Sequence, residues 1–354
     1  MSATKPTCRE IWCELKGRVD EELARAGAIR RAPASIWIKV SLLLLSLAAS
    51  YTGIILLQPG PLWLLLWAQA GVTTFFLMVC AAHDASHGVL SASSLLNRIA
   101  LLVTFGLLGI DGALWGVRHR AAHHAHTNVS EVDPDSSPNP FLRLSPHHPW
   151  RPWFRFQAYY AILLYPLALA HTAIIQDFEH LVCRSLPYVD KLPSRRVAFL
   201  RALLIKIVYL LVFVILPWKF LHVPLVWVLV GVATKFLVAS TVFVLTICLN
   251  HYVTETTFYD TTSHPAEDSH LMHQLRSSAD WYPTSYFWCW LMGGANAHTA
   301  HHLFPSVSHA HYPAISRIIQ ETAKKYNLPY NNFSFAQGLR SHFTFLNALG
   351  RYTV

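Results

Sequence analysis

Charged residues are scarce in this chain. Asp, Glu, Lys and Arg make up 13% of its 354 residues, against about 25% in a typical soluble domain. Together with a hydrophobic content of 53%, this shortage excludes an ordinary soluble enzyme and indicates a polytopic membrane protein. The aromatic content of 13% supplies abundant apolar surface to bury, which excludes a disordered protein.

Cysteine pairs and nucleic-acid-binding patterns are also missing. The six Cys include no Cys-x-x-Cys pair, so we expect free thiols in a reducing compartment. No basic helix or aromatic-basic repeat accompanies the net charge of +9. We therefore attribute this charge to a cytoplasmic face beside anionic lipid and expect no nucleic-acid partner. Residues 1–35 lack the apolar core that a cleaved signal peptide needs.

Long apolar runs are what the chain does have. Four of them approach the roughly 20 residues needed to cross a bilayer, and short links join them into two hairpins. These runs are residues 36–57, 62–82, 203–218 and 223–249. Two weaker runs are 99–114 and 158–175. Within the fourth run, Lys235 is expected to extend its ammonium group to the far membrane interface.

Histidine is abundant, at 21 residues, and is costly to place near lipid unless something binds it. Most of the informative ones fall into three clusters at the predicted membrane boundaries. Imidazoles at positions i and i+4 share one face of a helix, and an adjacent third His points about 100° away. The clusters are His83-Asp-Ala-Ser-His87, His119-Arg-Ala-Ala-His123-His124 and His298-Thr-Ala-His301-His302; His251 follows the fourth run at the same depth.

The membrane topology follows from requiring these clusters to meet on one side of the membrane. Residues 99–114 then cannot cross once and should be re-entrant or peripheral, and residues 158–175 should lie at the interface. The Lys and Arg bias agrees, because the termini and the central loop carry basic residues and the hairpin turns carry few. We predict an all-α protein with four transmembrane helices in two hairpins, interfacial helices and a cytoplasmic helical cap.

Three regions follow from this topology. Residues 1–35 form a cytoplasmic N-terminal segment, 36–325 the membrane domain and 326–354 a cytoplasmic C-terminal tail. Apolar residues at helical spacing in 10–26 predict a helix, which lies either on the membrane surface or in solvent. Both termini and the histidine clusters are expected to be cytoplasmic.

The histidine clusters predict a metal site. Eight imidazoles exceed what one tetrahedral zinc uses, so two neighbouring ions suit their number better. Imidazole alone does not choose between Fe, Zn and Cu. The apolar setting favours iron, because a lipid substrate without a polar handle needs oxidative C–H chemistry that zinc cannot supply. A metal transporter, the alternative class, would need polar residues at mid-membrane depth, and the apolar runs carry almost none.

The chain resembles the membrane fatty acid desaturases, a family marked by the boxes H-x(3,4)-H, H-x(2,3)-H-H and [HQ]-x-x-H-H in this order. Neighbouring residues match as well, including Trp115, Thr127-Asn128 and Leu303-Phe304-Pro305. The third box begins with His298 rather than with the Gln of front-end desaturases, and the residues that follow look closer to the methyl-directed acyl desaturases. The His-Pro-Gly-Gly signature of a fused cytochrome b5 domain does not occur.

This resemblance implies an O2-dependent fatty acyl desaturase with two iron ions. The substrate would be an acyl lipid, acyl-CoA or acyl-ACP, and a separate ferredoxin or cytochrome b5 would supply electrons. A related hydroxylase, acetylenase, or sphingolipid or carotenoid oxygenase stays open, because one site geometry can insert oxygen or remove hydrogens. No catalytic residue is expected beyond the metal ligands. The expected ligands are His83, His87, His119, His123, His124, His251, His298, His301 and His302.

Polar residues near the boxes are candidates for orienting these ligands. A residue that accepts the second ring N–H of a ligating histidine fixes its tautomer. For Asp135 and Glu255 a solvated carboxylate is an equally good interpretation, and for Asn250 so is packing. The candidates are Asp84, Asp133, Asp135, Asp177, Asn250, Glu255, His309 and His311.

Overall fold

The computed structural model describes residues 6–27, 29–182, 194–261 and 269–351. Helices dominate these residues, as the sequence predicts. The all-α prediction misses one short parallel pair of strands, β1 (Ala279–Trp281) and β2 (Asn331–Phe333). The chain divides into two compact units. The first comprises Met1–Pro33, His123–Ala158 and Ile247–Val354, and the second comprises Ala34–Ala122 and Tyr159–Thr246.

Long apolar helices are the main feature of the second unit. Among the described residues, five helical stretches are long and apolar enough to cross a membrane, as expected of an integral membrane protein. Four of them contain the four predicted runs. The fifth contains residues 158–175, which we expected at the interface. The stretches are Ala34–Leu56, Pro61–Ser86, Pro152–Glu179, Arg195–Leu221 and Leu225–His251.

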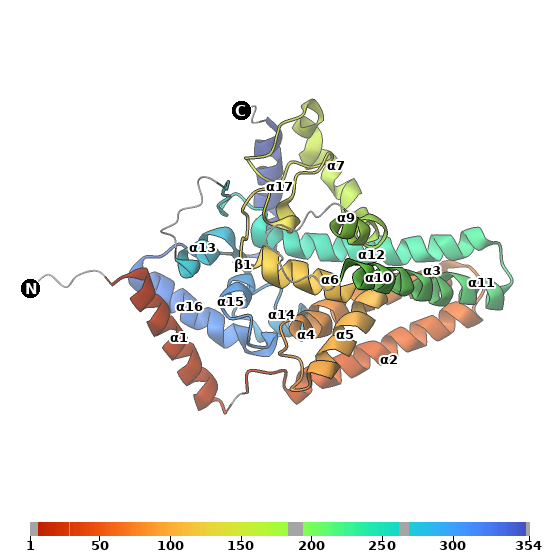
Figure 1. Cartoon of the computed structure of the whole chain (residues 1–354), viewed down its shortest axis with the longest axis horizontal. Helices are drawn as coiled ribbons and strands as arrows, with labels where there is room; N and C mark the ends of the chain where they lie inside the picture. The colour runs from red at the N-terminus through yellow and green to blue at the C-terminus, as the bar shows by residue number, and fades with distance from the viewer. Residues whose placement is uncertain (1–5, 28, 183–193, 262–268, 352–354) are drawn as a thin grey trace, which may run out of the picture. The chain divides into compact units, whose positions relative to one another are not determined.

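The helices of the second unit follow the expected hairpins. A hairpin of α2 and α3 comes first (Figure 1), with Pro61 at the first turn of α3, where its missing N–H costs nothing. A π-helical turn, Met78–Ala82, then leads into α4. The helices are α2 (Ala34–Leu56), α3 (Pro61–Leu77), α4 (His83–Ser86), α5 (Ser94–Gly106), α6 (Gly112–Val117), α8 (Ala168–His171), α9 (Asp177–Val182), α10 (Arg195–Leu210) and α11 (Leu216–Leu221). Two more, α7 (Gln157–Leu164) and α12 (Leu225–His251), begin or end in the first unit.

Glycine permits the close packing of α3 against α12. A Cβ atom on Gly71 would lie 2.5 Å from the carbonyl oxygen of Lys235, and one on Gly231 would lie 2.3 Å from the indole nitrogen of Trp67. Small residues at such contacts let helix backbones approach closely within a membrane. The packing between the two hairpins therefore depends on these two positions.

Lys235 does not extend its ammonium group out of the protein, contrary to our expectation. Its side chain is fully buried, and its ammonium group donates to the carbonyl oxygen of Leu107. The same group lies 3.5 Å from the ring centroid of Phe213 and 5.1 Å from that of Tyr209. The hydrogen bond to the carbonyl and the cation–π contacts with the two rings offset the desolvation cost of the buried ammonium group.

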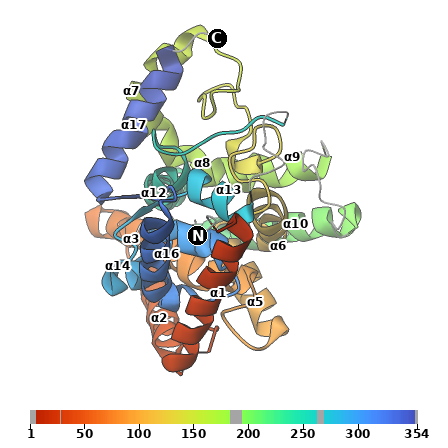
Figure 2. The same ribbon diagram turned by 90° about the vertical axis from the view of Figure 1, so that its left-hand side faces the viewer.

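The first unit has its own hydrophobic core. Helices α1 (Cys8–Arg25) and α16 (Tyr312–Tyr326) lie side by side (Figure 2). The apolar face of α1, formed by Ile11, Leu15, Val19 and Leu23, is buried in this core. Arg18 pairs with Glu321, and Lys325 with Glu14 at 2.7 Å. That face is used inside the protein, which leaves it unavailable to a membrane surface.

The remaining elements of this unit surround that core. Asp280 in β1 pairs with Asn332 in β2. Arg143, in the loop before the stretch Pro152–Glu179, contacts α17 by donating to the carbonyl oxygen of Leu349 at 3.0 Å. The other helices are α13 (His270–Ser277), α14 (Tyr286–Leu291), α15 (His298–Leu303) and α17 (Phe335–Arg351).

Candidate metal centre

The nine predicted ligands divide between the two units. His83 begins α4 and His87 directly follows its last residue, and the second box begins in the π-helical turn Arg118–His123 that continues α6. Helix α15 carries the third box, and His251 is the last residue of α12. The second unit holds His83, His87 and His119, and the first unit holds His123, His124, His251, His298, His301 and His302.

Four buried imidazoles converge in the first unit. One potential ligand atom from each of His123, His251, His298 and His302 lies within 4.8 Å of all the others. The Nε2 atoms of His251 and His298 are 2.7 Å apart, and those of His302 and His298 are 3.0 Å apart. Imidazole nitrogens are ligands that transition-metal ions prefer. Four of them this close together in a buried site therefore form a candidate binding site for such an ion.

The other ring nitrogen of three of these histidines faces a hydrogen-bond acceptor. Nδ1 of His123 lies 3.1 and 3.2 Å from the two carboxylate oxygens of Asp133. Nδ1 of His251 lies 2.9 Å from the carbonyl oxygen of Ser277. Donation from Nδ1 in both rings leaves Nε2 as the lone-pair atom that faces the cluster, which is the tautomer that a metal ligand needs.

A threonine hydroxyl supports His302 in the same way. The Oγ1 atom of Thr127 donates to the carbonyl oxygen of His123 at 2.9 Å and lies 3.3 Å from Nδ1 of His302. Because the hydroxyl proton is used, its oxygen accepts from the ring N–H of His302. Thr127 therefore links the second and third boxes within this unit.

Asp133 is itself held rigidly. Its side chain is buried, and it caps the 3-10 turn Pro134–Ser136 by accepting from the backbone N–H of Asp135 at 3.0 Å. It also accepts from the backbone N–H of Asn128 at 2.9 Å. Asp135 lies farther from His123, with an N···O distance of 3.7 Å, and its side chain is about one-third exposed. Of the two carboxylates, Asp133 has the geometry of the orienting partner.

Three more imidazoles come together in the second unit. The ring centroids of His83, His87 and His119 are 5.1 to 5.3 Å apart in pairs, and their ligand atoms lie within 4.8 Å of one another. The indole of Trp115 stacks on His119, with 4.6 Å between centroids and an interplanar angle of 15°. Trp115 lies four residues before His119, and its stacking fixes the orientation of the His119 ring.

Asp111 fixes the start of the helix that leads to His119. Its carboxylate caps α6 by accepting from the backbone N–H groups of Ala113 and Leu114 at 3.0 and 3.2 Å. The guanidinium of Arg201 in α10 donates to both of its oxygens, at 3.0 and 2.8 Å. The cap and the charge-assisted pair with Arg201 both restrain the N-terminus of α6. They therefore limit movement of the segment that leads to His119.

Asp177 joins this network rather than orienting a histidine, contrary to our expectation. One of its oxygens accepts from the backbone N–H of Asp111 at 2.9 Å and from the ammonium of Lys206 at 2.7 Å. Lys206 also donates to the carbonyl oxygen of Gly109 at 3.1 Å. The positive charge of Lys206 stabilises the buried carboxylate of Asp177. Asp177 is therefore paired without contacting an imidazole.

His124 and His301 stand next to each other in the first unit. The His124 ring stacks on His302 at 4.4 Å and 19°, and meets His301 edge-on at 4.5 Å between centroids. Nδ1 of His301 lies 3.2 Å from the hydroxyl oxygen of Tyr312. Gly294, with φ of +76°, allows Tyr312 to sit there, since a Cβ at that position would lie 2.6 Å from the Tyr312 ring.

The remaining candidate supports have different surroundings. Asp84 is buried on α4 between the two histidines of the first box. Nδ2 of Asn250 donates to the carbonyl oxygen of Ala295 at 2.8 Å, and its Oδ1 has no hydrogen-bond partner among the described residues. His309 is fully buried beside Gly294. These three stay candidates by position.

Two candidates contact other parts of the first unit instead. Nε2 of His311 lies 3.0 Å from the carbonyl oxygen of Ile29. The carboxylate of Glu255 accepts from the hydroxyl of Ser341. Both groups serve packing between segments that the sequence does not show to be neighbours.

Burial favours the neutral form of one imidazole in each cluster. It lowers the pKa of His302 well below its ordinary value, and the neighbouring imidazoles add to this effect. Burial, reinforced by His83, lowers the pKa of His87 to about 3. Neutral imidazole is the form that binds a metal, so the shifts of His302 and His87 favour metal binding at neutral pH.

Several supporting groups were not found from the sequence. Thr127 was noted only as a residue matching the resembled family, and Asp111 was not noted at all. Ser277 contributes a backbone carbonyl, which no side-chain pattern can reveal. The position of Asp111 just before a helix that ends in a histidine box is a capping signal that could have identified it.

Comparison with known proteins identifies the family of this chain. Residues 61–334 match the family described as Fatty acid desaturase. The chain is 28% identical over 344 residues to the sn-1 linoleoyl-lipid 6-desaturase of Synechocystis sp., covering 95% of this chain and 94% of that protein. A protein of the same name from Arthrospira platensis is 26% identical over 322 residues, covering 90% of this chain and 86% of that protein.

A third relative is the acyl-lipid (8-3)-desaturase of Physcomitrium patens, 27% identical over 276 residues, which are 77% of this chain and 57% of that protein. The match to the family covers more than half of the chain and includes the three histidine boxes, β1 and most of the apolar stretches. The chain belongs to the fatty acid desaturase family and is an oxidoreductase.

Proposed function

We propose that this protein is an O2-dependent desaturase of fatty acyl chains esterified in membrane lipids. The observation that carries the proposal is the pair of imidazole clusters in which ring nitrogens converge. In the first-unit cluster, the opposite nitrogens of three of the four histidines face hydrogen-bond acceptors. The acyl-lipid carrier is favoured over acyl-CoA and acyl-ACP because the relatives that match over most of the chain are named lipid desaturases.

Two iron ions are proposed, one in each cluster. In the first unit the donors would be His123, His251, His298 and His302. In the second unit they would be His83, His87 and His119, and His124 and His301 complete the nine ligands. Seven of these rings contribute to clusters of purely nitrogen donors, a composition that suits iron as well as zinc or copper.

The reaction needs reduced iron, electrons with protons, and correctly oriented ligands, and this chain supplies the last of these. When bound, reduced iron supplies the O2-dependent removal of two hydrogen atoms from neighbouring methylene carbons, which leaves a double bond. Two electrons from a separate ferredoxin or cytochrome b5 and two protons balance the reduction of O2 to two waters. Asp133, Thr127 and the Ser277 carbonyl hold the imidazole protons at Nδ1, so that Nε2 stays available to the metal.

The membrane arrangement is proposed as four crossings with the termini and the histidines in the cytoplasm. The stretch Pro152–Glu179 is interrupted by 3-10 turns at Pro152–Phe156 and Tyr165–Leu167 and by a π-helical turn at Thr172–Gln176. These interruptions suit a segment that lies at the interface. Helix α5, with 13 residues, is short of the roughly 20 needed to cross.

Labelling of single cysteines in residues 58–61 and 219–224 by an impermeant maleimide should occur only from outside.

The position of the new double bond stays a prediction. The residues from His298 to Tyr312 favour methyl-directed attack, whereas two relatives are named 6-desaturases. Because the product analysis below reports the position directly, it decides between these alternatives.

Expression in a host that lacks polyunsaturated lipids tests the function. Total fatty acids would be analysed by gas chromatography with mass spectrometry, and the wild type compared with His301→Ala. A new double bond that is absent from the variant supports the proposal. A hydroxylated or triple-bonded product would replace it with the related oxygenase or acetylenase, and an iron-loaded protein without any product from lipid-bound chains would refute the acyl-lipid substrate.

A further inference from the structure

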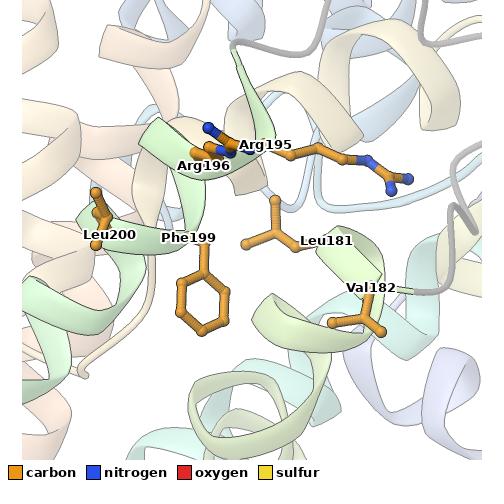
Figure 3. Close-up of a pocket in the computed structure, with 6 residues that line it drawn as sticks. All are labelled: Leu181, Val182, Arg195, Arg196, Phe199 and Leu200. Carbon is orange, nitrogen blue, oxygen red and sulfur yellow. The ribbon is translucent and has the colours of Figure 1, made fainter.

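A cavity of about 420 Å³ lies between the end of α9 and the start of α10, within the second unit. Figure 3 shows the two arginine side chains on one side of the apolar ones, with Leu181 and Phe199 pointing into the space between the helices. None of its lining residues is a predicted metal ligand. The lining residues are Leu181, Val182, Arg195, Arg196, Phe199 and Leu200.

The apolar part of this cavity is largely exposed. The exposed fractions are 66% for Val182, 41% for Phe199 and 62% for Leu200. Leu181 is only 5% exposed, because it packs against Ala198 in α10. Phe199 and Leu200 belong to the candidate span Arg195–Leu221. An exposed apolar surface on such a helix faces lipid tails rather than water.

The basic residues of α10 divide into two pairs with different roles. Arg201 and Lys206 are neutralised inside the unit by Asp111 and Asp177. Arg195 and Arg196, at the cavity, form no ion pair with any described residue. Within the described part of the chain, their side chains therefore present two positive charges at the edge of an apolar surface without an anion to balance them.

We propose that this cavity binds an anionic phospholipid. The guanidinium groups of Arg195 and Arg196, which extend in different directions in Figure 3, would turn toward the headgroup phosphate and bind it through charge-assisted hydrogen bonds, and an acyl chain would lie along Val182, Phe199 and Leu200. Basic pockets between transmembrane helices bind anionic headgroups in this way. A protein partner fits less well, since the apolar part of the surface lies on a candidate membrane span. The inference is independent of the proposed desaturase activity.

The test measures lipid binding to the purified full chain in a neutral detergent by native mass spectrometry. The probes are phosphatidylglycerol and phosphatidylcholine with identical acyl chains. The wild type should bind phosphatidylglycerol roughly tenfold more tightly, because two basic residues favour the anionic headgroup. Arg195→Gln combined with Arg196→Gln should abolish that preference. The matched control, Arg31→Gln with Arg98→Gln, removes the same charge from exposed positions elsewhere and should preserve it.

A second pair of measurements separates the headgroup from the tail. Val182→Ser with Leu200→Ser should weaken binding of long-chain phosphatidylglycerol but not of its dihexanoyl form. Inorganic phosphate at about 10 mM should not displace the long-chain lipid, because it lacks the tail. Monodispersity and melting temperature confirm that each variant is folded.

Three results would overturn the proposal. They are equal affinity of the wild type for the two lipids, an unchanged preference in the folded arginine variant, and displacement by inorganic phosphate. If the glutamine pair does not fold, Arg195→Lys with Arg196→Lys replaces it. That variant keeps the charge but loses the planar fork that matches phosphate, so a reduced preference is expected and an undiminished one would count against the site.

Discussion

The carboxylate of Asp133 should control how tightly the first-unit cluster binds iron. It is buried, and it accepts from Nδ1 of His123, at 3.1 Å, as well as from two backbone N–H groups. Asp133→Asn keeps the size of the side chain, but the amide can present an acceptor to only some of these three donors. Its NH2 group would therefore face either a backbone N–H or the His123 ring, and the ring would lose its fixed tautomer.

The expected loss can be worked from this contact. Removing such an orienting partner costs about 10- to 100-fold in metal affinity, which equals about 1.4 to 2.7 kcal/mol of binding free energy. Iron per chain would be measured after dialysis of the purified protein against graded concentrations of a chelator. The variant should lose iron from one of two sites at a 10- to 100-fold lower chelator concentration than the wild type.

Asp135→Asn is the matched control. Its carboxylate is 3.7 Å from the same ring and one-third exposed, so solvent screens it and the effect should be small. An Asp133→Asn protein that keeps both irons as firmly as the wild type would refute the reasoning. So would a control that loses iron as readily as Asp133→Asn.

Three further predictions follow from single contacts. Thr127→Val removes the acceptor of the third-box imidazole and should lower iron affinity several-fold. Thr299→Val, whose hydroxyl faces the carboxylate of Asp280 and no imidazole, should leave iron affinity unchanged; chelator titration distinguishes the two variants, and equal losses would argue against the role of Thr127. Burial lowers the pKa of His342 to about 4 from 6.5, so the unfolded chain takes up a proton first as the pH falls, and up to about 3 kcal/mol of stability is lost between pH 6.5 and 4; melting curves should show a weaker pH dependence for His342→Gln, and an identical dependence would contradict this. Asp111→Asn and Arg201→Gln should each destabilise the protein by more than about 2 kcal/mol because each leaves a partly buried charge unpaired, and the double variant should lose less than the sum; strict additivity in a double-mutant cycle would show that the pair is not coupled.

The histidine boxes could be found in the sequence because their geometry is local. Residues four apart share a helix face whatever surrounds the helix, so His83 and His87, or His298 and His302, could be paired without a structure. The four long apolar runs were found for the same reason. Their length and composition alone predict the helices that the structure contains.

The surroundings of these elements could not be found in this way. The supports of His251 and His302 come from residues 26 and 175 positions away, and one of them is a backbone carbonyl. The position of the Lys235 ammonium group was predicted wrongly because hydropathy does not reveal the carbonyl and the two aromatic rings that contact it. Asp177 was predicted as a candidate for orienting a histidine, but its carboxylate pairs with Lys206.

The helix at the N-terminus illustrates the same limit. Its apolar spacing predicted the helix but not the surface that covers it, because membrane and protein core select the same amphipathic pattern. The structure shows neither of the two expected surroundings, membrane surface or solvent, because the apolar face of this helix packs in a protein core with α16. The salt bridge between Glu14 and Lys325 joins the same two helices.

The most direct test of the central claim, that each cluster binds one iron of a desaturase centre, is the metal content of cluster-specific variants. Purified wild-type protein, His83→Ala and His251→Ala would be analysed for iron, zinc and copper by inductively coupled plasma mass spectrometry. The account predicts about two irons per chain in the wild type and about one in each variant. A single metal ion in the wild type, zinc in place of iron, or two irons retained in either variant would contradict it.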